Sequence, residues 1–154
     1  MKLALAIVFL LVNSLWINIV SANPLVDVVI ADQSYQLEYV ADPESRRQGL
    51  MGRASLAPDT GMLFDFPQGT QPKIWMRNMQ ISLDLLFVDN HGRIVDIYPS
   101  VPPCISMPCT VYSASQPLRF VIEVAAGTVE SLGLETGLLL QMPAQLLEQP
   151  APSY

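Results

Sequence analysis

The sequence predicts an α+β domain that is predominantly β, with a curved mixed sheet or partly closed barrel and two short helices. Two observations carry this prediction. Short runs rich in β-branched and aromatic residues recur along the chain, separated by clusters of Gly, Pro, Asn and Asp. Only two segments, following residues 42 and 127, have the capping residues of a helix. Residues 23–142 are long enough for a single β-rich domain with a core and too short for two.

The expected elements follow one another closely along the chain. Strands are expected at residues 26–31, 35–40, 62–66, 74–76, 83–88, 93–98, 119–125 and 138–142. A helix is expected from the N-cap Asp42 to about Met51, with Gly52 as its stop. One helical turn at residues 127–132, capped by Thr128, and a disordered Pro-rich tail at residues 143–154 complete the chain.

Residues 1–22 have the pattern of a secretory signal peptide. Lys2 precedes an unbroken apolar run at residues 3–12, and Val20-Ser21-Ala22 resembles a signal-peptidase cleavage site. A retained membrane anchor is the alternative, since the apolar stretch approaches the length of a bilayer span. Polar residues interrupt that stretch and favour cleavage. We therefore expect a periplasmic or secreted protein with no stable membrane insertion once the signal is removed.

The acidic charge of the chain excludes some partners. Its net charge is −6, and the loss of Lys2 would make it more negative by one. Such a surface repels nucleic acid, so we expect no nucleic-acid partner. The single histidine, His91, lies in a polar turn, so the usual zinc sites and histidine-activated nucleophiles lack their residues. The sequence predicts no cofactor and no metal.

Both cysteines lie in one proline-rich loop. Cys104 and Cys109 are separated by four residues, and in an oxidising compartment such a pair most simply forms a disulfide. A redox dithiol and a pair of metal ligands are the alternatives. The spacing is not the C-x-x-C of thioredoxin-like sites, which favours a structural disulfide.

Two carboxylates stand within apolar strands. Asp84 belongs to the strand at 83–88 and Glu123 to the strand at 119–125. Alternate residues of a strand point to opposite faces, and both faces are apolar here, so both acids should be at least partly buried. Each could anchor backbone N–H groups or pair with an arginine. Alternatively, one of them is a general acid or accepts a ligand.

Basic residues and methionines gather in one part of the chain. Five of the basic residues are Arg46, Arg47, Arg53, Lys73 and Arg77. If the strand containing Trp75 lies beside the first helix, an acidic protein has one positive hollow suited to a carboxylate, sulfate, phosphate or acidic sugar. The alternative is that these arginines pair with the buried acids and with helix carbonyls. The nearby methionines, Met51, Met62, Met76 and Met79, could bind Cu(I), but without histidines or a Met-x-x-Met array they more simply fill a core or pocket.

Several motifs resemble a known family. They are Arg46-x-x-Gly49-Leu50-Met51-x-Arg53-x-x-Leu56, Gly61-Met62-Leu63-Phe64-x-Phe66, Trp75-Met76-Arg77-Asn78, Leu83-Asp84-x-x-Phe87, Gly92-Arg93-Ile94-Val95, Tyr112 and Glu123-x-x-x-Gly127. In this order they resemble the domain-of-unknown-function family 192, also called uncharacterised protein family 0127. The resemblance implies a β-rich α+β domain that is often exported, and no particular reaction. The family pattern tends to read Trp-Met-Lys-Asn-Thr, so Arg77 replaces a lysine here and Met79 a threonine.

The motifs and the basic cluster give ten candidate ligand-binding residues. They are Arg46, Met51, Arg53, Met62, Trp75, Met76, Arg77, Asn78, Asp84 and Glu123. We expect an exported small-ligand binding or accessory module, with a Trp/Met/Arg-lined pocket for a small anionic or polar ligand. One alternative is a carboxylate-dependent hydrolase or lyase using Asp84 or Glu123. Another is an envelope protein-interaction domain. The sequence leaves open whether the protein is an enzyme.

Overall fold

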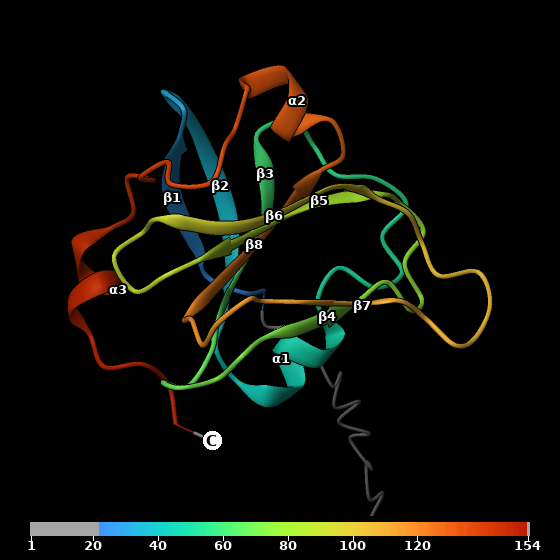
Figure 1. Ribbon diagram of the computed structural model, residues 1–154, viewed down its shortest axis with the longest axis horizontal. Helices are drawn as coiled ribbons and strands as arrows, with labels where there is room; N and C mark the ends of the chain where they lie inside the picture. Colours follow the sequence, from blue (N-terminus) through green and yellow to red (C-terminus); the bar gives the residue numbers. More distant parts are fainter. Residues whose placement is uncertain (1–21, 154) are drawn as a thin grey trace, which may run out of the picture.

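The computed structural model describes residues 22–153, so the predicted signal peptide lies, apart from its last residue, outside the described residues. Eleven elements follow in order (Figure 1): β1 (Leu25–Ile30), β2 (Gln33–Val40), α1 (Pro43–Gln48), β3 (Thr60–Asp65), β4 (Lys73–Trp75), β5 (Leu83–Val88), β6 (Ile94–Val101), β7 (Val111–Ser113), β8 (Phe120–Ala125), α2 (Thr128–Leu132) and α3 (Ala144–Glu148). No helix in the described part of the chain is long and apolar enough to cross a membrane.

Six strands form one mixed sheet and two form a small second sheet. The large sheet has the order β1-β2-β3-β8-β5-β6, in which β2 and β3 are parallel and all other neighbours are antiparallel. β4 and β7 pair separately and lie beside α1 (Figure 1). The predicted α+β class, with strands predominating and a mixed sheet, is confirmed. Among the described residues the sheet does not close into a barrel, and there are three short helices rather than the two expected.

The segment at 138–142 does not form the expected strand. It makes only isolated bridges, from Gln141 to Val29 of β1 and from Leu139 to Arg93 just before β6. These bridges tie together the two edges of the large sheet. The segment therefore partly covers the opening that a further strand would have closed.

The first helix begins as predicted and ends earlier than predicted. The Asp42 carboxylate accepts hydrogen bonds from the backbone N–H groups of Glu44 and Ser45 at 3.0 and 2.9 Å. The helix stops at Gly49, which has φ 48°, and not at Gly52. A Cβ at Gly49 would stand 3.3 Å from the ring of Phe64, so this position also brings the backbone unusually close to the sheet.

Two other local expectations were wrong. Gly127, not Thr128, is the N-cap of α2, and the Thr128 hydroxyl instead donates to the carbonyl of Ala125 at 2.7 Å. The segment expected to be a disordered tail contains α3, because Leu146 is buried against the sheet and Arg119 donates a hydrogen bond to the carbonyl of Gln149 at 2.8 Å.

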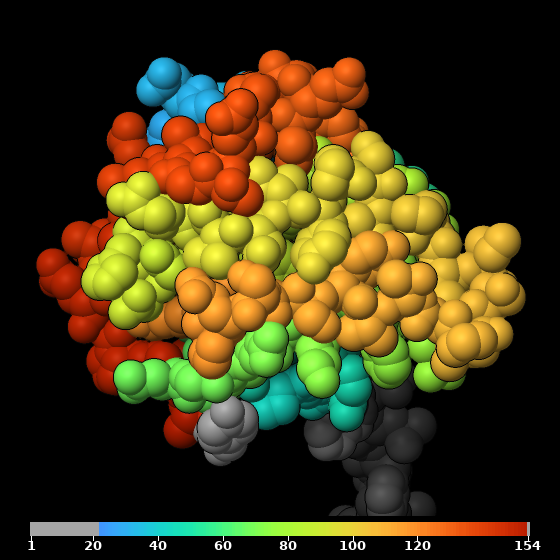
Figure 2. Space-filling view, viewed as in Figure 1, coloured from blue at the N-terminus to red at the C-terminus, as the bar shows by residue number. Residues whose placement is uncertain are grey.

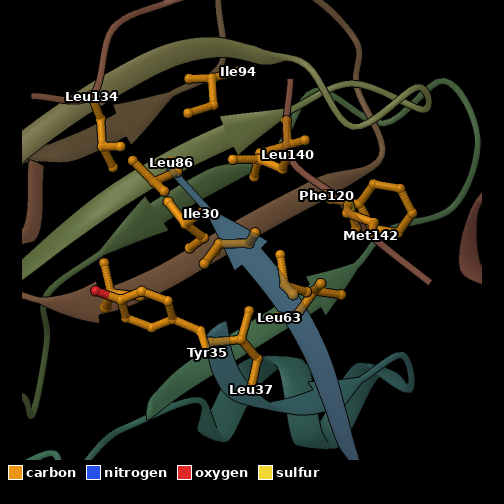
Figure 3. Close-up of a cluster of buried hydrophobic side chains, with 14 of the residues drawn as sticks. Ile30, Tyr35, Leu37, Leu63, Leu86, Ile94, Phe120, Leu134, Leu140 and Met142 are labelled. Carbon is orange, nitrogen blue, oxygen red and sulfur yellow. The ribbon is translucent and has the colours of Figure 1, made fainter. Parts of the chain in front are cut away.

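The large sheet buries an apolar cluster on each face. One cluster includes Ile30, Leu63 and Phe120 and is covered by the chain after α2 (Figure 3). The other includes Phe64 and Val121 and is covered by the loop after α1, β4 and β7. Neighbouring residues of β3 and β8 therefore serve opposite clusters, as the alternation of side chains along a strand requires. The second cluster forms the base of the candidate site.

Two buried acids have partners within the chain. Asp65 accepts two hydrogen bonds from the Arg119 guanidinium, each 2.8 Å long. Asp84 is fully buried and accepts the backbone N–H groups of Ser100 at 2.6 Å and Val129 at 2.7 Å. Asp84 thus anchors β6 and the start of α2, which is the structural role that the sequence favoured.

Candidate functional site

A cleft of about 270 Å³ lies between α1 with its following loop, β4 and one face of the large sheet. Apolar side chains make up most of its wall: Leu50, Phe64, Phe66, Ile74, Trp75 and Met79. Phe64 and Phe66 are alternate residues at the end of β3, and their rings stack with centroids 6.3 Å apart. The early end of α1 at Gly49 allows the following loop, with Leu50 and Met51, to fold over this face.

Glu123 brings a carboxyl group to the cleft from the middle of the large sheet. It lies on β8, opposite Met62 of β3 and Leu85 of β5, and is 5% exposed. Its carboxyl makes no hydrogen bond or ion pair with any residue in the range 22–153, and its oxygens are open to the cleft, because no side-chain oxygen that lacks a partner is fully buried in this part of the chain. Burial raises the pKa of Glu123 from 4.5 to about 8. At neutral pH the group is therefore mostly a neutral acid that can donate a hydrogen bond into the cleft.

Three cations also line the cleft, and one is held by the protein itself. Arg46 donates through Nη1 to the backbone oxygens of Ala41 and, at 2.9 Å, Asp65, and its guanidinium lies 5.4 Å from the centroid of the Phe66 ring. Arg47 and Lys73 are exposed and have no hydrogen-bond or ion-pair partner within the described part of the chain. Their charges are therefore available to a ligand.

The Trp75 side chain connects the cleft to the outer surface of β4. It lines the cleft and is 43% exposed. The guanidinium of Arg77 lies 5.9 Å from the centroid of its ring, within the range of a cation–π interaction. The Trp75 ring thus lies between the Arg77 guanidinium and the apolar wall of the cleft.

Four of the ten candidate residues line the cleft, and two more lie at its margin in contact with Trp75 or Met51. Arg46, Met51, Trp75 and Glu123 line it directly. Arg77 stacks on Trp75, and the Asn78 amide lies 3.8 Å from the sulfur of Met51. The predicted juxtaposition of α1 with the Trp75 strand is therefore found in the structure.

The other four candidates do not line the cleft. Met62 and Met76 are buried in the apolar cluster beneath it, and Asp84 anchors loops. Arg53 lies beyond the end of α1 and pairs with Glu38 at 2.5 and 2.8 Å, so its charge is already paired within the protein. The alternative that the clustered arginines pair with Asp84 or Glu123 is also wrong for the described residues, because the carboxylate oxygens of Asp84 accept backbone N–H groups and Glu123 has no partner.

Sequence reasoning missed several cleft residues. Arg47 and Lys73 were noticed as cations but not as site residues, and Phe64, Phe66 and Met79 were not proposed. The alternation Phe64-x-Phe66 places two rings on one face of a strand and was the available signal. Lys73-x-Trp75 was a second such signal.

No group of three or more His, Cys, Asp or Glu residues in the described part of the chain is arranged to hold a metal ion. Cys104 and Cys109 form a disulfide with a Cα–Cα distance of 5.6 Å, so neither is a free thiol. Of the four methionines considered for copper, Met51 and Met79 line the cleft, whereas the other two are in the core.

Residues 26–142 match the family model DUF192, described as uncharacterized ACR. The chain belongs to this family. The DUF192 match runs from β1 to the segment after α2, so it contains every residue that lines the cleft and leaves out α3. A comparison with curated proteins finds no match.

Two solved structures resemble this DUF192 chain. One is the crystal structure of a candidate transcription regulator from Sinorhizobium meliloti 1021, with 36% identity and a TM-score of 0.69 over 77% of this chain and 92% of the other. The second is a protein of unknown function from Novosphingobium aromaticivorans DSM 12444, with 27% identity and a TM-score of 0.66 over 76% of this chain and 83% of the other.

Proposed function

We propose that this DUF192 chain is an exported binding or accessory module that holds a small anionic or polar ligand in the cleft. The observation that carries the proposal is Glu123, a buried carboxyl group that faces the cleft without a partner in the described chain. A buried polar group needs a hydrogen-bond partner to offset its desolvation. A ligand polar group is the partner that this geometry calls for.

The lining of the cleft suggests how such a ligand lies. The rings of Phe64 and Trp75 cover its apolar part, and Glu123 donates a hydrogen bond to an oxygen at its inner end. Arg47 and Lys73 meet an anionic group. A volume of about 270 Å³ suits a ligand smaller than most drug-sized molecules.

Tryptophan fluorescence provides a direct test. The chain has two tryptophans, and Trp16 lies in the predicted signal peptide, so the emission of the protein that begins at Asn23 reports on Trp75 alone. We expect members of a panel of small carboxylates, sulfates, phosphates and acidic sugars to change the Trp75 emission and raise the melting temperature. Lys73→Ala should weaken this binding by about threefold, the effect of one exposed ion pair, whereas Arg93→Ala on the β5–β6 turn should not.

Two results would contradict the proposal. In the first, no compound in the panel changes the emission or the melting temperature. In the second, Lys73→Ala and Glu123→Leu, which removes the polar group altogether, bind every compound as Arg93→Ala does.

An enzyme is the second candidate, and the environment of Glu123 favours it. A carboxyl group with its pKa raised to about 8 by burial is protonated at neutral pH and can serve as a general acid in a hydrolase or lyase. Asp84, the other acid considered for this role, is occupied by backbone N–H groups. Loss of turnover in Glu123→Gln with ligand affinity retained would support an enzyme over a binding module.

The proposed location is the periplasm or the exterior of the cell. The signal-like segment at residues 1–22 and the disulfide, which is typical of an oxidising compartment, support this proposal. Mass spectrometry of the exported protein should find Asn23 as the first residue. Recovery of an uncleaved chain with free thiols in the cytoplasmic fraction would contradict it.

We do not extend the transcription-regulator description of the Sinorhizobium relative to this chain. A net charge of −6 opposes binding to a phosphate backbone, which is the main source of affinity for nucleic acid. An envelope interaction domain remains a third proposal, favoured by the exposed Ile105 and Met107 in the disulfide loop.

A further inference from the structure

A row of exposed side chains leads from the cleft along β4. Lys73, Trp75 and Arg77 are exposed, whereas Ile74 and Met76 between them are buried, so the three exposed side chains share one side of an extended segment. Lys73 and Trp75 line the cleft, and Arg77 lies beyond it. Figure 2 shows the β4 segment (green) at the surface between β7 (orange) and α1 (teal). We call these three residues the β4 row.

The chain segments that form β4, β7 and the disulfide loop carry no acidic residue, and Glu123 is the acid that lines the cleft beside them. Residues 66–82 and 97–122, which include β4, β7 and the disulfide loop, contain no Asp or Glu, in a chain with 14 acidic residues. Asp96 on β6 approaches β7 only to accept hydrogen bonds from the N–H and hydroxyl of Ser115, at 2.7 and 2.8 Å. The charges of Lys73 and Arg77 are therefore locally uncompensated, and the complementary ligand is anionic.

The length of the row exceeds that of a small ligand. Lys73 and Arg77 are four residues apart, which is about 13 Å along an extended chain. A small molecule held by Glu123 and Lys73 does not use Arg77, which lies outside the lining of the cleft. A linear ligand with repeated anionic groups can use both cations, and the exposed part of the Trp75 ring, beside the Arg77 guanidinium, lies between them to support a ring of that ligand.

The buried end of the cleft favours hydroxyl groups. The Glu123 carboxyl donates a hydrogen bond when protonated and only accepts when ionised. A hydroxyl both donates and accepts, so it satisfies Glu123 in either state, whereas a sulfate oxygen only accepts and satisfies the protonated state alone. Rings that carry both hydroxyls and carboxylates match the cleft and the β4 row together.

From these observations we infer that the ligand is an acidic oligosaccharide, whose end occupies the cleft and whose chain continues over Trp75 to Arg77. This inference rests on the proposed function and adds the ligand class and the direction of the chain. An acidic peptide would pair through its backbone with the edge of β4 that β7 leaves open, and it would not use the face of the Trp75 ring. The ring and the separated cations favour a saccharide, and tetraglutamate tests the peptide.

Calorimetric titration with four probes tests the inference: galacturonic acid, tetragalacturonate, uncharged maltotetraose and tetraglutamate. Tetragalacturonate should bind more tightly than the monomer by about tenfold or more, because its additional rings reach the rest of the row. Arg77→Ala should weaken the tetramer about threefold, the effect of one exposed ion pair, and leave the monomer unchanged. Arg93→Ala, which removes a cation on the β5–β6 turn, is the matched control and should change neither.

The outcomes separate this inference from the proposed function. Equal affinities for monomer and tetramer, or an Arg77→Ala variant that behaves as Arg93→Ala, would refute the path along β4 and leave the cleft as a binding site. Binding of small non-sugar anions without binding of either uronate, or tighter binding of tetraglutamate or maltotetraose, would refute the ligand class. If no probe and no small anion binds, and Glu123→Gln changes only stability, both proposals fail.

Discussion

Replacing Glu123 by glutamine should remove a pH dependence from the stability of the protein. The pKa of Glu123 rises from 4.5 to about 8 because the carboxyl is buried, and this corresponds to about 5 kcal/mol between the folded and unfolded states. Below pH 4.5 the carboxyl is protonated in both the folded and the unfolded state, so its raised pKa does not lower the free energy of unfolding. As the pH rises from 4.5 to about 8, the unfolded state releases its proton first, so the wild type loses stability relative to Glu123→Gln. Above about pH 8 the carboxyl is ionised in both states, so the difference in free energy of unfolding between the wild type and Glu123→Gln no longer changes with pH.

The measurement is urea unfolding of the wild type and Glu123→Gln at pH 4.5, 6, 7.5 and 9, with the difference in free energy plotted against pH. Taking the difference cancels the opposite contributions of carboxylates such as Glu38, whose pKa is lowered by its hydrogen bond with Arg53. Glu130→Gln, on the exposed side of α2, is the control for the removal of an exposed carboxyl. A flat difference for Glu123→Gln would refute the buried, unpartnered carboxyl on which the proposed function depends.

Three further variants test the other structural assignments. Asp84→Asn should lower the free energy of unfolding by about 2 kcal/mol, because the amide keeps one acceptor for two backbone N–H groups, and should leave ligand binding intact. Cys104→Ser should cost about 2 kcal/mol, the chain entropy of a short closed loop, as judged by urea unfolding under oxidising conditions. Gly49→Ala should be more destabilising than Gly52→Ala by thermal unfolding, since both have positive φ but only the Gly49 Cβ would press on a cleft ring. Equal losses for the two glycine variants would contradict the proposed close packing.

The sequence predicted well wherever periodicity decided the structure. The strand at 83–88 is found with the predicted bounds. Its residues are apolar on both faces except for Asp84, and such a strand fits only in the middle of a sheet that is covered on both sides. The start of α1 was equally predictable, since the cap at Asp42 acts through its own neighbours. Both signals are local, and no distant residue needed to be known.

The errors occurred where a distant contact decided the local structure. α1 ends at Gly49, which combines a positive φ with a close approach to Phe64, a residue fifteen positions later, and Arg53 therefore lies outside the helix. The tail folds as α3 because Arg119 holds the carbonyl of Gln149. The cleft itself was only partly predictable for the same reason: its cations could be listed from the sequence, but which of them are already held by the protein depends on the packing.

The three buried acids of the described chain show why the cleft requires a partner from outside. Asp65 is neutralised by Arg119, and Asp84 accepts two backbone N–H groups, so each is satisfied by the fold itself. Glu123 is equally buried in the sheet but has no such group, and at neutral pH its burial costs several kcal/mol of a total stability of about 5–15 kcal/mol. Leucine would fill the same strand position without that cost. A carboxyl group that faces the cleft and destabilises the free protein is best explained by a bound state in which a ligand supplies the missing hydrogen bond.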